Sequence, residues 1–558
     1  MNRVSEFTRR EALLALSSAA IAGASPAAAP EVPARIVERN DAAAGNYLRT
    51  QNTEPGSPWR GSVPDDYQMH HAGSAGGLIE TLTAALVCPQ SKHHQESELG
   101  ERIRLAARFL ERCQSPEGNI SLLTTNFNSP PDTGFVVHNV GTAAAIAKIY
   151  SEEAVLRHLR PFLVAAAGGM AAGGIHTPNH RWVVSSALAQ VNALFPNPGY
   201  EQRINQWLAE GIDIDDEGQF IERSTVTYNT VCDRAFTVLA AKLRRPELLD
   251  PVRRNLRAML YLVHPDGEVV TEVSRRQDQF TRGTMAGYWF PLQYLAVHDG
   301  DRQFAGLAGK LAPEYGRLSA MLEYPELAGA LPEAAPAPDN YEKTFPLTGL
   351  ARIRRGELDG TMVLSGNSRF FSARRGGAVV EAVRFVTSFF GKGQFVPTTS
   401  VKQNGSYVFK QTLEGPYYLP LLPPQRVTSQ NWSALRERRR KAQVCRLEQS
   451  ATVTERANGF DVRVESRGTD GVPLALEITL REGGKLEGCR AAPHAEGAWL
   501  LEREYATYRV DGSLVRFGPG AAPHLQTQLR GAETKLPGVS VYLTGYTPFD
   551  RTVRFEFS

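Results

Sequence analysis

Cysteine is scarce in this sequence, and long hydrophobic runs are lacking. The five cysteines, Cys88, Cys113, Cys232, Cys445 and Cys489, lie far apart and form no CxxC pair. Such a sparse and odd set argues against a disulfide framework, so we expect mostly buried thiols. No segment after the N-terminus has about 18 consecutive uncharged apolar residues, so we expect the mature protein not to be a membrane protein.

A strong net charge is lacking too. The formal net charge is +3, which suits an acidic substrate but is too small to argue for one. The densest basic run, Arg436 to Lys441 (RERRRK), is a single stretch that we interpret as solvated surface. The sequence therefore has no nucleic-acid-binding signature.

The N-terminus has the pattern of an export signal. Thr8 to Leu14 (TRREALL) contains a twin arginine, a weakly apolar segment from Ala15 to Ala24 follows, and residues 27–29 are three alanines typical of a cleavage site. The apolar segment is too short and too rich in alanine to span a bilayer. We therefore assign residues 1–30 to a twin-arginine signal and expect a periplasmic or secreted protein.

Hydrophobic periodicity predicts that the next part of the chain is helical. Apolar residues recur at three- and four-residue spacing in residues 76–87, 100–113, 140–150, 152–167, 181–194, 228–243, 248–263, 284–297 and 302–318. Short segments rich in glycine, proline, asparagine and aspartate separate these stretches. The pattern indicates paired antiparallel helices in a bundle, a solenoid or a closed α/α toroid. We find no fixed-period repeat, which disfavours the solenoid.

The period changes to two after a linker rich in proline and alanine, Leu331 to Asn340. Short β-branched and aromatic runs follow at residues 377–385, 406–410, 460–465, 474–480, 539–545 and 552–557. These runs and the turn signals between them predict an antiparallel β-sandwich. We therefore expect a multidomain α+β protein, with an (α/α) toroid catalytic domain at residues 31–335 and a β-sandwich domain at residues 336–558.

The sequence HTPNHRW is the first candidate site. Thr177 can cap a helix whose first position is Pro178, which places Asn179 and His180 in the first helical turn. Free backbone N–H groups and the helix dipole attract an anion there, such as a sugar carboxylate. The alternative is a capping asparagine with a core histidine. Pro178 breaks the helix between His176 and His180, which disfavours a metal pair.

A second candidate site follows the acidic, glycine-containing turn of residues 213–218. It contains Glu222 and Ser224, and Tyr228 begins a predicted helix. A tyrosine at the mouth of a helix can give its phenolic proton to a leaving glycosidic oxygen, or take one. The alternative is a core tyrosine whose hydroxyl is hydrogen-bonded.

His138 is the third candidate. It ends a predicted loop just before the helix that we expect at residues 140–150. A histidine at a helix start is a candidate proton acceptor because its ordinary pKa lies near neutrality. A capping or packing role is the alternative.

The fourth candidate is a polar loop at residues 274–289. Arginine clamps carboxylates in a forked geometry, and aromatic rings stack on sugar faces. We interpret this loop as a binding rim that includes Arg275, Arg276, Arg282, Tyr288 and Trp289, although each residue alone would be ordinary surface or core. The other residues that we assign to substrate binding are His176, Arg181 and Glu222.

These features together resemble a known family. A helical toroid before a β-sandwich, with Asn179-His180 opening one helix and Glu222-x-Ser224-x-x-x-Tyr228 opening a later one, is similar to heparinase II/III-type and alginate polysaccharide lyases. In that family an asparagine and a histidine neutralise the uronate carboxylate, and a tyrosine acts as acid and often also as base. The resemblance implies these roles for Asn179, His180 and Tyr228, without a metal or another cofactor.

The chain departs from the family pattern at two points. The family often takes a further catalytic histidine from the sheet domain, where this chain has only His494 and His524, in unfamiliar contexts. We therefore substitute His138 as the candidate base. The family's tyrosine is commonly followed by histidine, whereas Asn229 follows Tyr228 here.

Two other functions stay open. A glycoside hydrolase on the same toroid would use two carboxylates from the set Asp132, Asp215, Asp216 and Glu222. A glycan-binding protein without turnover would use Trp289 and the arginines for affinity alone. We expect a lyase that cleaves an acidic polysaccharide or oligosaccharide by metal-independent β-elimination, with the uronic acid, the linkage and the oligomeric state left open.

Overall fold

The computed structural model describes residues 28–493 and 495–558 of the chain. The predicted export signal lies outside these residues except for its last three positions, and His494 lies outside them too. Within the described ranges, no helix has both the length and the hydropathy that a membrane span requires.

Helices form the first part of the described chain. They are α2 (Ala34–Thr50), α3 (Ala72–Val87), α4 (Ser97–Cys113), α5 (Pro130–Ile149), α6 (Glu153–Ala172), α7 (Pro178–Leu194), α8 (Pro198–Ala209), α9 (Tyr228–Leu243), η1 (Pro246–Leu249), α10 (Asp250–Met259), η2 (Ala286–Tyr288), α11 (Trp289–Asp299), α12 (Arg302–Tyr315), α13 (Leu318–Glu323) and η3 (Pro325–Ala328). A short hairpin, β1 (Ile120–Leu122) and β2 (Asn126–Ser129), precedes α5.

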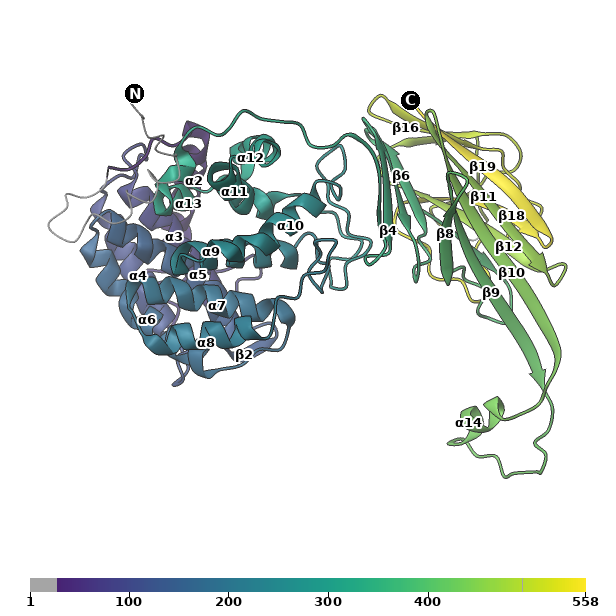
Figure 1. Cartoon of the computed structure of the whole chain (residues 1–558), viewed down its shortest axis with the longest axis horizontal. Coiled ribbons are helices and arrows are strands. Elements are labelled where there is room, and N and C mark those ends of the chain that lie inside the picture. Colours follow the sequence, from purple (N-terminus) through teal and green to yellow (C-terminus); the bar gives the residue numbers. More distant parts are fainter. Residues whose placement is uncertain (1–27, 494) are drawn as a thin grey trace, which may run out of the picture.

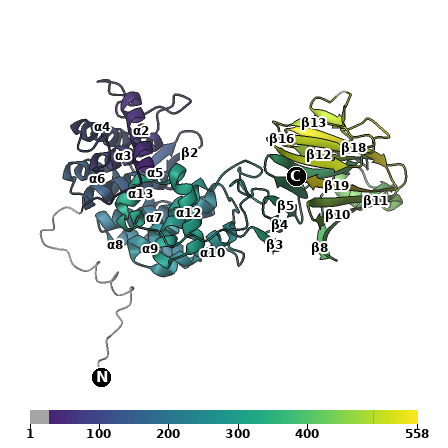
Figure 2. The same cartoon turned by 90° about the horizontal axis from the view of Figure 1, so that it is seen from above.

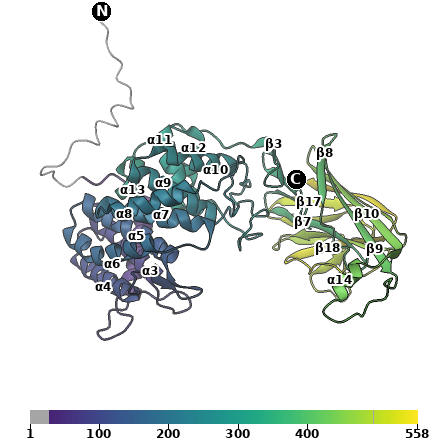
Figure 3. The same ribbon diagram turned by 60° about the horizontal axis from the view of Figure 1, so that its bottom comes forward.

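The helices pack as an inner and an outer layer. Helices α3, α5, α7 and α9 lie side by side, and α4, α6, α8 and α10 cover them from outside (Figures 1 and 3). Helix α5 is buried on almost every side, whereas α4 buries one apolar face, as an inner and an outer helix should. Helix α12 contacts α2, so the end of the series meets its beginning. This arrangement confirms the predicted toroid.

One type of turn recurs before the inner helices. Gln68, Gly118, Gly218 and Gly267 all have positive φ, and they follow one another at intervals of about 50 residues or twice that. A Cβ atom at Gly118 would lie 2.1 Å from the carbonyl oxygen of Ala165, so only glycine fits there. These turns do not appear as a fixed-period repeat in the sequence, because they share backbone geometry more than residue identity. The shorter connection before α7 also interrupts the spacing.

Strands form the second part. They are β3 (Asn340–Phe345), β4 (Leu350–Arg355), β5 (Leu358–Val363), β6 (Phe371–Arg375), β7 (Ala378–Thr387), β8 (Thr399–Gln403), β9 (Ser406–Tyr418), β10 (Lys441–Arg456), β11 (Gly459–Gly468), β12 (Pro473–Leu480), β13 (Lys485–Glu487), β14 (Arg490–Ala491), β15 (Ala498–Leu500), β16 (Ala506–Val510), β17 (Ser513–Gly518), β18 (Val539–Tyr546) and β19 (Phe549–Phe557). A single short helix, α14 (Trp432–Glu437), lies between β9 and β10.

These strands form two sheets that pack face to face. One sheet has the order β13-β16-β17-β19-β11-β10-β9-β8, and the other has the order β14-β15-β18-β12-β7-β6-β5-β4-β3. All pairings are antiparallel except β15 with β18, which is parallel. Inward-facing side chains of both sheets form one apolar core, which includes Phe371, Phe460 and Phe555. The predicted β-sandwich is therefore confirmed, and it lies beside the toroid (Figure 2).

The sequence did not predict α2, α8 or the short helix α13. Helix α2 buries four residues of 17, and α8 buries only Tyr200 and Ile204. Such sparse burial leaves too few apolar positions to produce a clear helical period.

Candidate active site

The N-terminal ends of the inner helices bring the candidate residues together. Helix α7 begins at Pro178 and α9 begins at Tyr228, as predicted. The helices lie side by side, so their first turns are neighbours. The loop between α10 and η2 crosses the same end of the toroid and supplies Arg276.

Asn179 is completely buried in the first turn of α7. Its Nδ2 atom donates to the Oε2 atom of Glu222 at 2.7 Å and to the Oγ1 atom of Thr177 at 3.2 Å. Its Oδ1 atom has no hydrogen-bond partner in the part of the chain that the structure describes. The Thr177 side chain makes no capping bond to the backbone, so Thr177 contacts Asn179 in place of its predicted capping role.

His180 packs edge-on against His176, with 4.6 Å between the ring centroids. Burial, followed by the nearby His176, lowers the pKa of His180 to about 4. The imidazole is therefore neutral at pH 7 and can donate a hydrogen bond from one nitrogen. Its Nδ1 atom has no partner among the described residues. His180 points inward, as its phase along α7 predicts.

Glu222, Arg276 and Tyr228 form a connected polar chain. Arg276 donates from Nη1 to the Oε1 atom of Glu222, and from Nη2 to the Tyr228 hydroxyl oxygen at 3.3 Å. The guanidinium also lies over the Tyr228 ring, 4.4 Å from its centroid. Gln277 donates to the same hydroxyl at 2.9 Å. Two donors therefore converge on the phenolic oxygen.

Glu222 joins the tyrosine to the asparagine, because Arg276 and Asn179 each donate to one of its carboxylate oxygens. Burial raises the pKa of Glu222, and the bond from Asn179 and the charge of Arg276 offset part of that rise. Glu222 is thus the structural centre of the site, whereas the sequence predicted it as a substrate-binding residue of a lyase or as a carboxylate of the alternative hydrolase.

Asp278 fixes the loop that carries Arg276. Its carboxylate accepts from Ser274 Oγ, from Ser224 Oγ at 2.8 Å and from the backbone N–H of Val226 at 3.2 Å. Ser224 Oγ in turn accepts from the backbone N–H of Tyr228 at 3.0 Å. The sequence gives no sign of this link, because Ser224 and Asp278 are 54 positions apart.

The structure contradicts the predicted position of His138 in a loop before a helix. His138 lies inside α5, not in a loop before a helix, and it is 2% exposed. Its Nε2 atom is 2.7 Å from Ser186 Oγ on α7, and burial, followed by the charge of Arg234, lowers its pKa well below the ordinary value. The helix starts earlier than predicted because Pro130 and Pro131 suit its first turn and the Ser129 side chain accepts from the Asp132 N–H. His138 is therefore a core residue that links α5 and α7.

The aromatic part of the predicted binding rim is also wrong. Tyr288 is 0% exposed and donates to the Thr225 carbonyl oxygen at 2.6 Å, and Trp289 is 1% exposed. Tyr288 ends η2 and Trp289 begins α11, and both side chains pack in apolar clusters of the toroid. Neither ring can stack on a sugar in this structure.

The remaining predicted binding residues have separate positions. His176 is beside His180, and Arg275 is exposed and donates to the Ile221 carbonyl oxygen at 3.3 Å. Arg181 is held by Asp213 at 2.8 Å, which gives it a structural contact outside the site. Arg282 is largely exposed and reaches Glu381 of the sandwich at 3.2 Å.

The acidic turn before Glu222 has structural partners. The Asp213 carboxylate accepts from Arg181 and Trp182, and that of Asp215 accepts from backbone N–H groups of its own turn. Glu217 accepts from the backbone N–H groups of Leu347 and Thr348, both at 2.8 Å, and so fastens the toroid to the sandwich.

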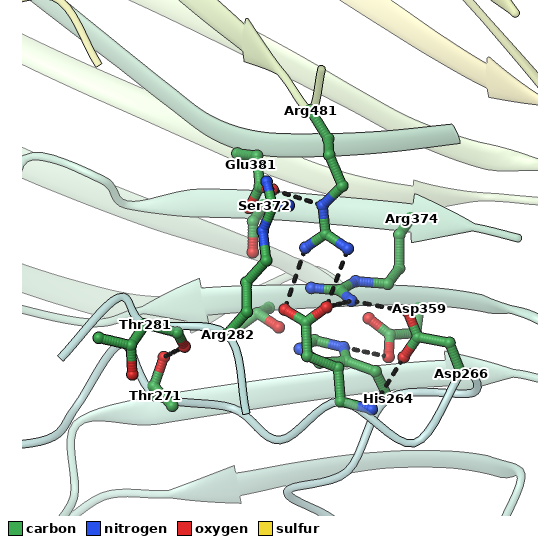
Figure 4. A network of polar contacts seen from close by, with 12 residues as sticks. His264, Asp266, Thr271, Thr281, Arg282, Asp359, Ser372, Arg374, Glu381 and Arg481 are labelled. Atoms are coloured by element: carbon green, nitrogen blue, oxygen red, sulfur yellow. Dashed lines mark hydrogen bonds and ion pairs between the residues drawn. The ribbon is translucent and has the colours of Figure 1, made fainter. Parts of the chain in front are cut away.

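A second polar cluster lies where the toroid meets the sandwich (Figure 4). His264 and the fully buried Arg352 both contact Asp359, each at 2.8 Å. Arg481 bonds both Glu268 and Glu381. A cavity of about 250 Å³ is next to these residues. Opposite charges pair throughout, so this cluster holds the two domains together.

A metal centre was not predicted. In residues 28–493 and 495–558, no group of three or more histidine, cysteine, aspartate or glutamate side chains could hold an ion.

No protein-family model matches the chain, and no curated protein sequence matches it. Solved structures do. The chondroitin AC lyase of Streptomyces coelicolor A3, in complex with chondroitin sulphate, superposes with a TM-score of 0.56 at 15% identity, over 96% of this chain and 80% of that one. Heparinase III gives 0.54 at 11% identity, over 96% and 87%. A Paenibacillus xanthan lyase gives 0.55 at 10% identity, over 94% and 57%. The chain therefore shares the toroid-and-sandwich fold of these polysaccharide lyases.

Proposed function

We propose that the protein is a polysaccharide lyase that cleaves a uronate-containing glycan by β-elimination. The observation that carries this proposal is the connected chain Asn179–Glu222–Arg276–Tyr228 at the helix starts. It places a phenol, a cation and a buried amide within one hydrogen-bonded cluster. The fold is shared with enzymes that act on chondroitin sulphate and xanthan, which supports an acidic glycan as the substrate.

The chemistry needs three things from these residues. The proton at C5 of a uronate is weakly acidic, so the carboxylate charge must be neutralised, a base must reach C5, and an acid must protonate the leaving O4. In this proposal the neutral His180 imidazole and the Asn179 amide donate hydrogen bonds to the carboxylate. Both N–H groups of the buried Asn179 amide already donate, to Glu222 and Thr177, so one of these bonds is exchanged for a bond to the substrate when the sugar binds. Tyr228 supplies the acid. After it gives up its proton, the donors Arg276 and Gln277 stabilise the charge left on its oxygen.

Tyr228 is also the base in this proposal. His138, the base that the sequence suggested, is enclosed in the core and bonded to Ser186. Tyr228 is partly exposed at the start of α9. One tyrosine can take the C5 proton and return a proton to O4 when both groups lie on the same side of the sugar ring.

The positions and partners of the carboxylates disfavour a glycoside hydrolase. That reaction needs two carboxyl groups on either side of the scissile bond. Asp213 and Glu217 bind structural partners, and the Asp215 carboxylate stabilises its own turn. Asp216 is fully exposed beside Arg254, and Asp132 accepts from Ser129 and Asn126. Glu222 alone remains in the cluster, and Arg276 pairs with it.

The test is the ultraviolet absorbance of the unsaturated uronate that elimination forms, measured with a panel of acidic polysaccharides. Tyr228→Phe should lower kcat by about 10²–10⁴, the usual contribution of general acid–base catalysis. Asp215→Asn, at another carboxylate that the alternative hydrolase could use, is the matched control for Glu222→Gln. New reducing ends without absorbance, made by Tyr228→Phe and lost in Glu222→Gln, would show hydrolysis. Binding without either product would show a glycan-binding protein. Export through the N-terminal segment belongs to this proposal and is tested by fractionating cells that express the full chain.

A further inference from the structure

A hairpin arm extends below the β-sandwich in Figure 1, and α14 lies at its end. Strands β9 and β10 pair along their whole length, to Tyr418 opposite Lys441. Strand β8 pairs with β9 only as far as Lys410, and β11 pairs with β10 only from Leu447 onward. The distal half of the hairpin is therefore a two-stranded ribbon, and residues 419–440 with α14 form its end. Such a ribbon is marginally stable by itself.

The end of this arm has a larger net positive charge than the whole protein. We call residues 417–441 the arm tip. They contain six cations and one carboxylate, Glu437, for a net charge of +5. The whole chain has a net charge of +3, so the rest carries −2. The cations are Arg426, Arg436, Arg438, Arg439, Arg440 and Lys441.

Four of these six cations, Arg426, Arg438, Arg439 and Arg440, form no ion pair with a carboxylate among the described residues. Arg436 pairs with Glu437, and Lys441 lies 3.9 Å from Glu414. Of the four, Arg426, Arg438 and Arg440 are exposed. Clustered arginines without acids repel one another, so an anion that binds them relieves this repulsion.

Large apolar side chains lie exposed among the arginines. Leu422 is 83% exposed, Tyr417 is 56% exposed and Trp432 is 49% exposed. Arg439 lies over the Trp432 ring, 5.2 Å from its centroid. Exposed aromatic rings beside free guanidinium groups are suited to a charged sugar, because the ring stacks on the sugar face and the guanidinium binds the acid group. Exposed apolar side chains gathered in one short segment are typical of an interaction surface.

We propose that the arm tip binds a linear polyanionic glycan and so holds the polymer outside the candidate active site. The choice of glycan as ligand rests on the proposed function. A second copy of the arm is disfavoured because two tips of +5 would repel each other. The motif RERRRK, predicted above to be solvated surface, lies at the surface of the arm tip. The proposal assigns a glycan ligand to it.

The test compares two full-length variants with the same change in charge. The arm variant is Arg426→Gln/Arg438→Gln/Arg440→Gln, and the control is Arg35→Gln/Arg157→Gln/Arg509→Gln, at exposed positions outside the arm. Both carry Tyr228→Phe so that the glycan is not consumed. Fluorescent heparin, alginate and neutral dextran are the probes. At about 50 mM salt the arm variant should bind the acidic chains at least about tenfold more weakly, with a log K against log[salt] slope smaller by about two to three.

The control should bind like the parent, and dextran should not bind. Equal losses in both variants would overturn the proposal, as would no loss in either. Stronger binding to DNA than to glycans would also overturn it. So would a dimer, seen by sedimentation, that dissociates in Leu422→Ser/Trp432→Ala without a change in glycan binding.

The two proposals fail in distinguishable ways. If the arm governs binding but no polysaccharide undergoes elimination, the arm proposal stands and the lyase fails. If elimination occurs and the arm variant binds like its control, the arm proposal fails alone. With Tyr228 restored, the arm variant should also lose kcat/KM on the polymer while it keeps that on a tetrasaccharide.

Discussion

Replacing Arg276 with methionine tests the polar chain of the site most directly. Methionine keeps much of the side-chain length but removes the positive charge. Glu222 then keeps only the bond from Asn179, and it is 6% exposed. The cation over the Tyr228 ring is lost as well.

The structure gives the size of the effect. Breaking a fully buried ion pair costs about 3–5 kcal/mol, because one charge stays behind without compensation. The Arg276 side chain is 26% exposed and the Asn179 bond remains, so we expect the lower end of that range or below. Loss of the cation–π contact adds about 0.5–1 kcal/mol. The expected total is about 2–3 kcal/mol at pH 7.

This cost should depend on pH in a defined direction. Burial already raises the pKa of Glu222, and removing Arg276 raises it further. Below the ordinary pKa of 4.5, Glu222 is protonated in both the folded and the unfolded protein. The ion-pair part of the destabilisation should therefore be complete above the raised pKa and should vanish as the pH falls below 4.5, which leaves only the cation–π contribution of about 0.5–1 kcal/mol.

Urea unfolding followed by tryptophan fluorescence measures the cost. Four of the six tryptophans lie in the toroid part of the sequence, so the signal reports mainly on that domain. Glu222→Gln/Arg276→Met should recover most of the stability, because no charge is left buried. The polar chain would be refuted if Arg276→Met lowered the free energy of unfolding by less than about 0.5 kcal/mol. It would also be refuted if Glu222→Gln/Arg276→Met recovered none of the lost free energy.

Three further predictions follow from burial. The pKa of His180 is about 4 in the folded protein, against an ordinary value of 6.5, so its contribution to stability is present above pH 6.5 and is lost as the pH falls toward 4. His180→Gln should therefore flatten the curve of unfolding free energy against pH in that window. An unchanged curve would contradict this prediction. Asp359→Asn leaves the fully buried Arg352 without its carboxylate and should cost about 3–5 kcal/mol in calorimetry, whereas an unaltered melting temperature would contradict the pairing. Tyr288→Phe should cost about 1 kcal/mol and leave kcat and KM unchanged; weaker substrate affinity would restore Tyr288 to the binding rim.

Local patterns in the sequence were sufficient for the fold class and for part of the site. The three-four spacing of apolar residues and the later period of two are properties of single helices and strands, so they predict paired helices followed by a sandwich without long-range information. The contact between α12 and α2, which closes the toroid, is a property of the tertiary structure. The helix starts at Pro178 and Tyr228 follow from the same local logic, which placed Asn179, His180 and Tyr228 at the mouth of the toroid.

Burial and long-range pairing were decided only by the tertiary structure. Tyr288 and Trp289 have the residue types of a sugar-binding rim, but the packing of α11 encloses them. A free histidine has a pKa that suits a base, but His138 is buried on α5 against α7, and burial lowers its pKa well below the ordinary value. The bonds from Arg276 to Glu222 and Tyr228 span 54 and 48 positions. No local pattern encodes such a pairing, because it arises when the loop after α10 crosses the ends of α7 and α9.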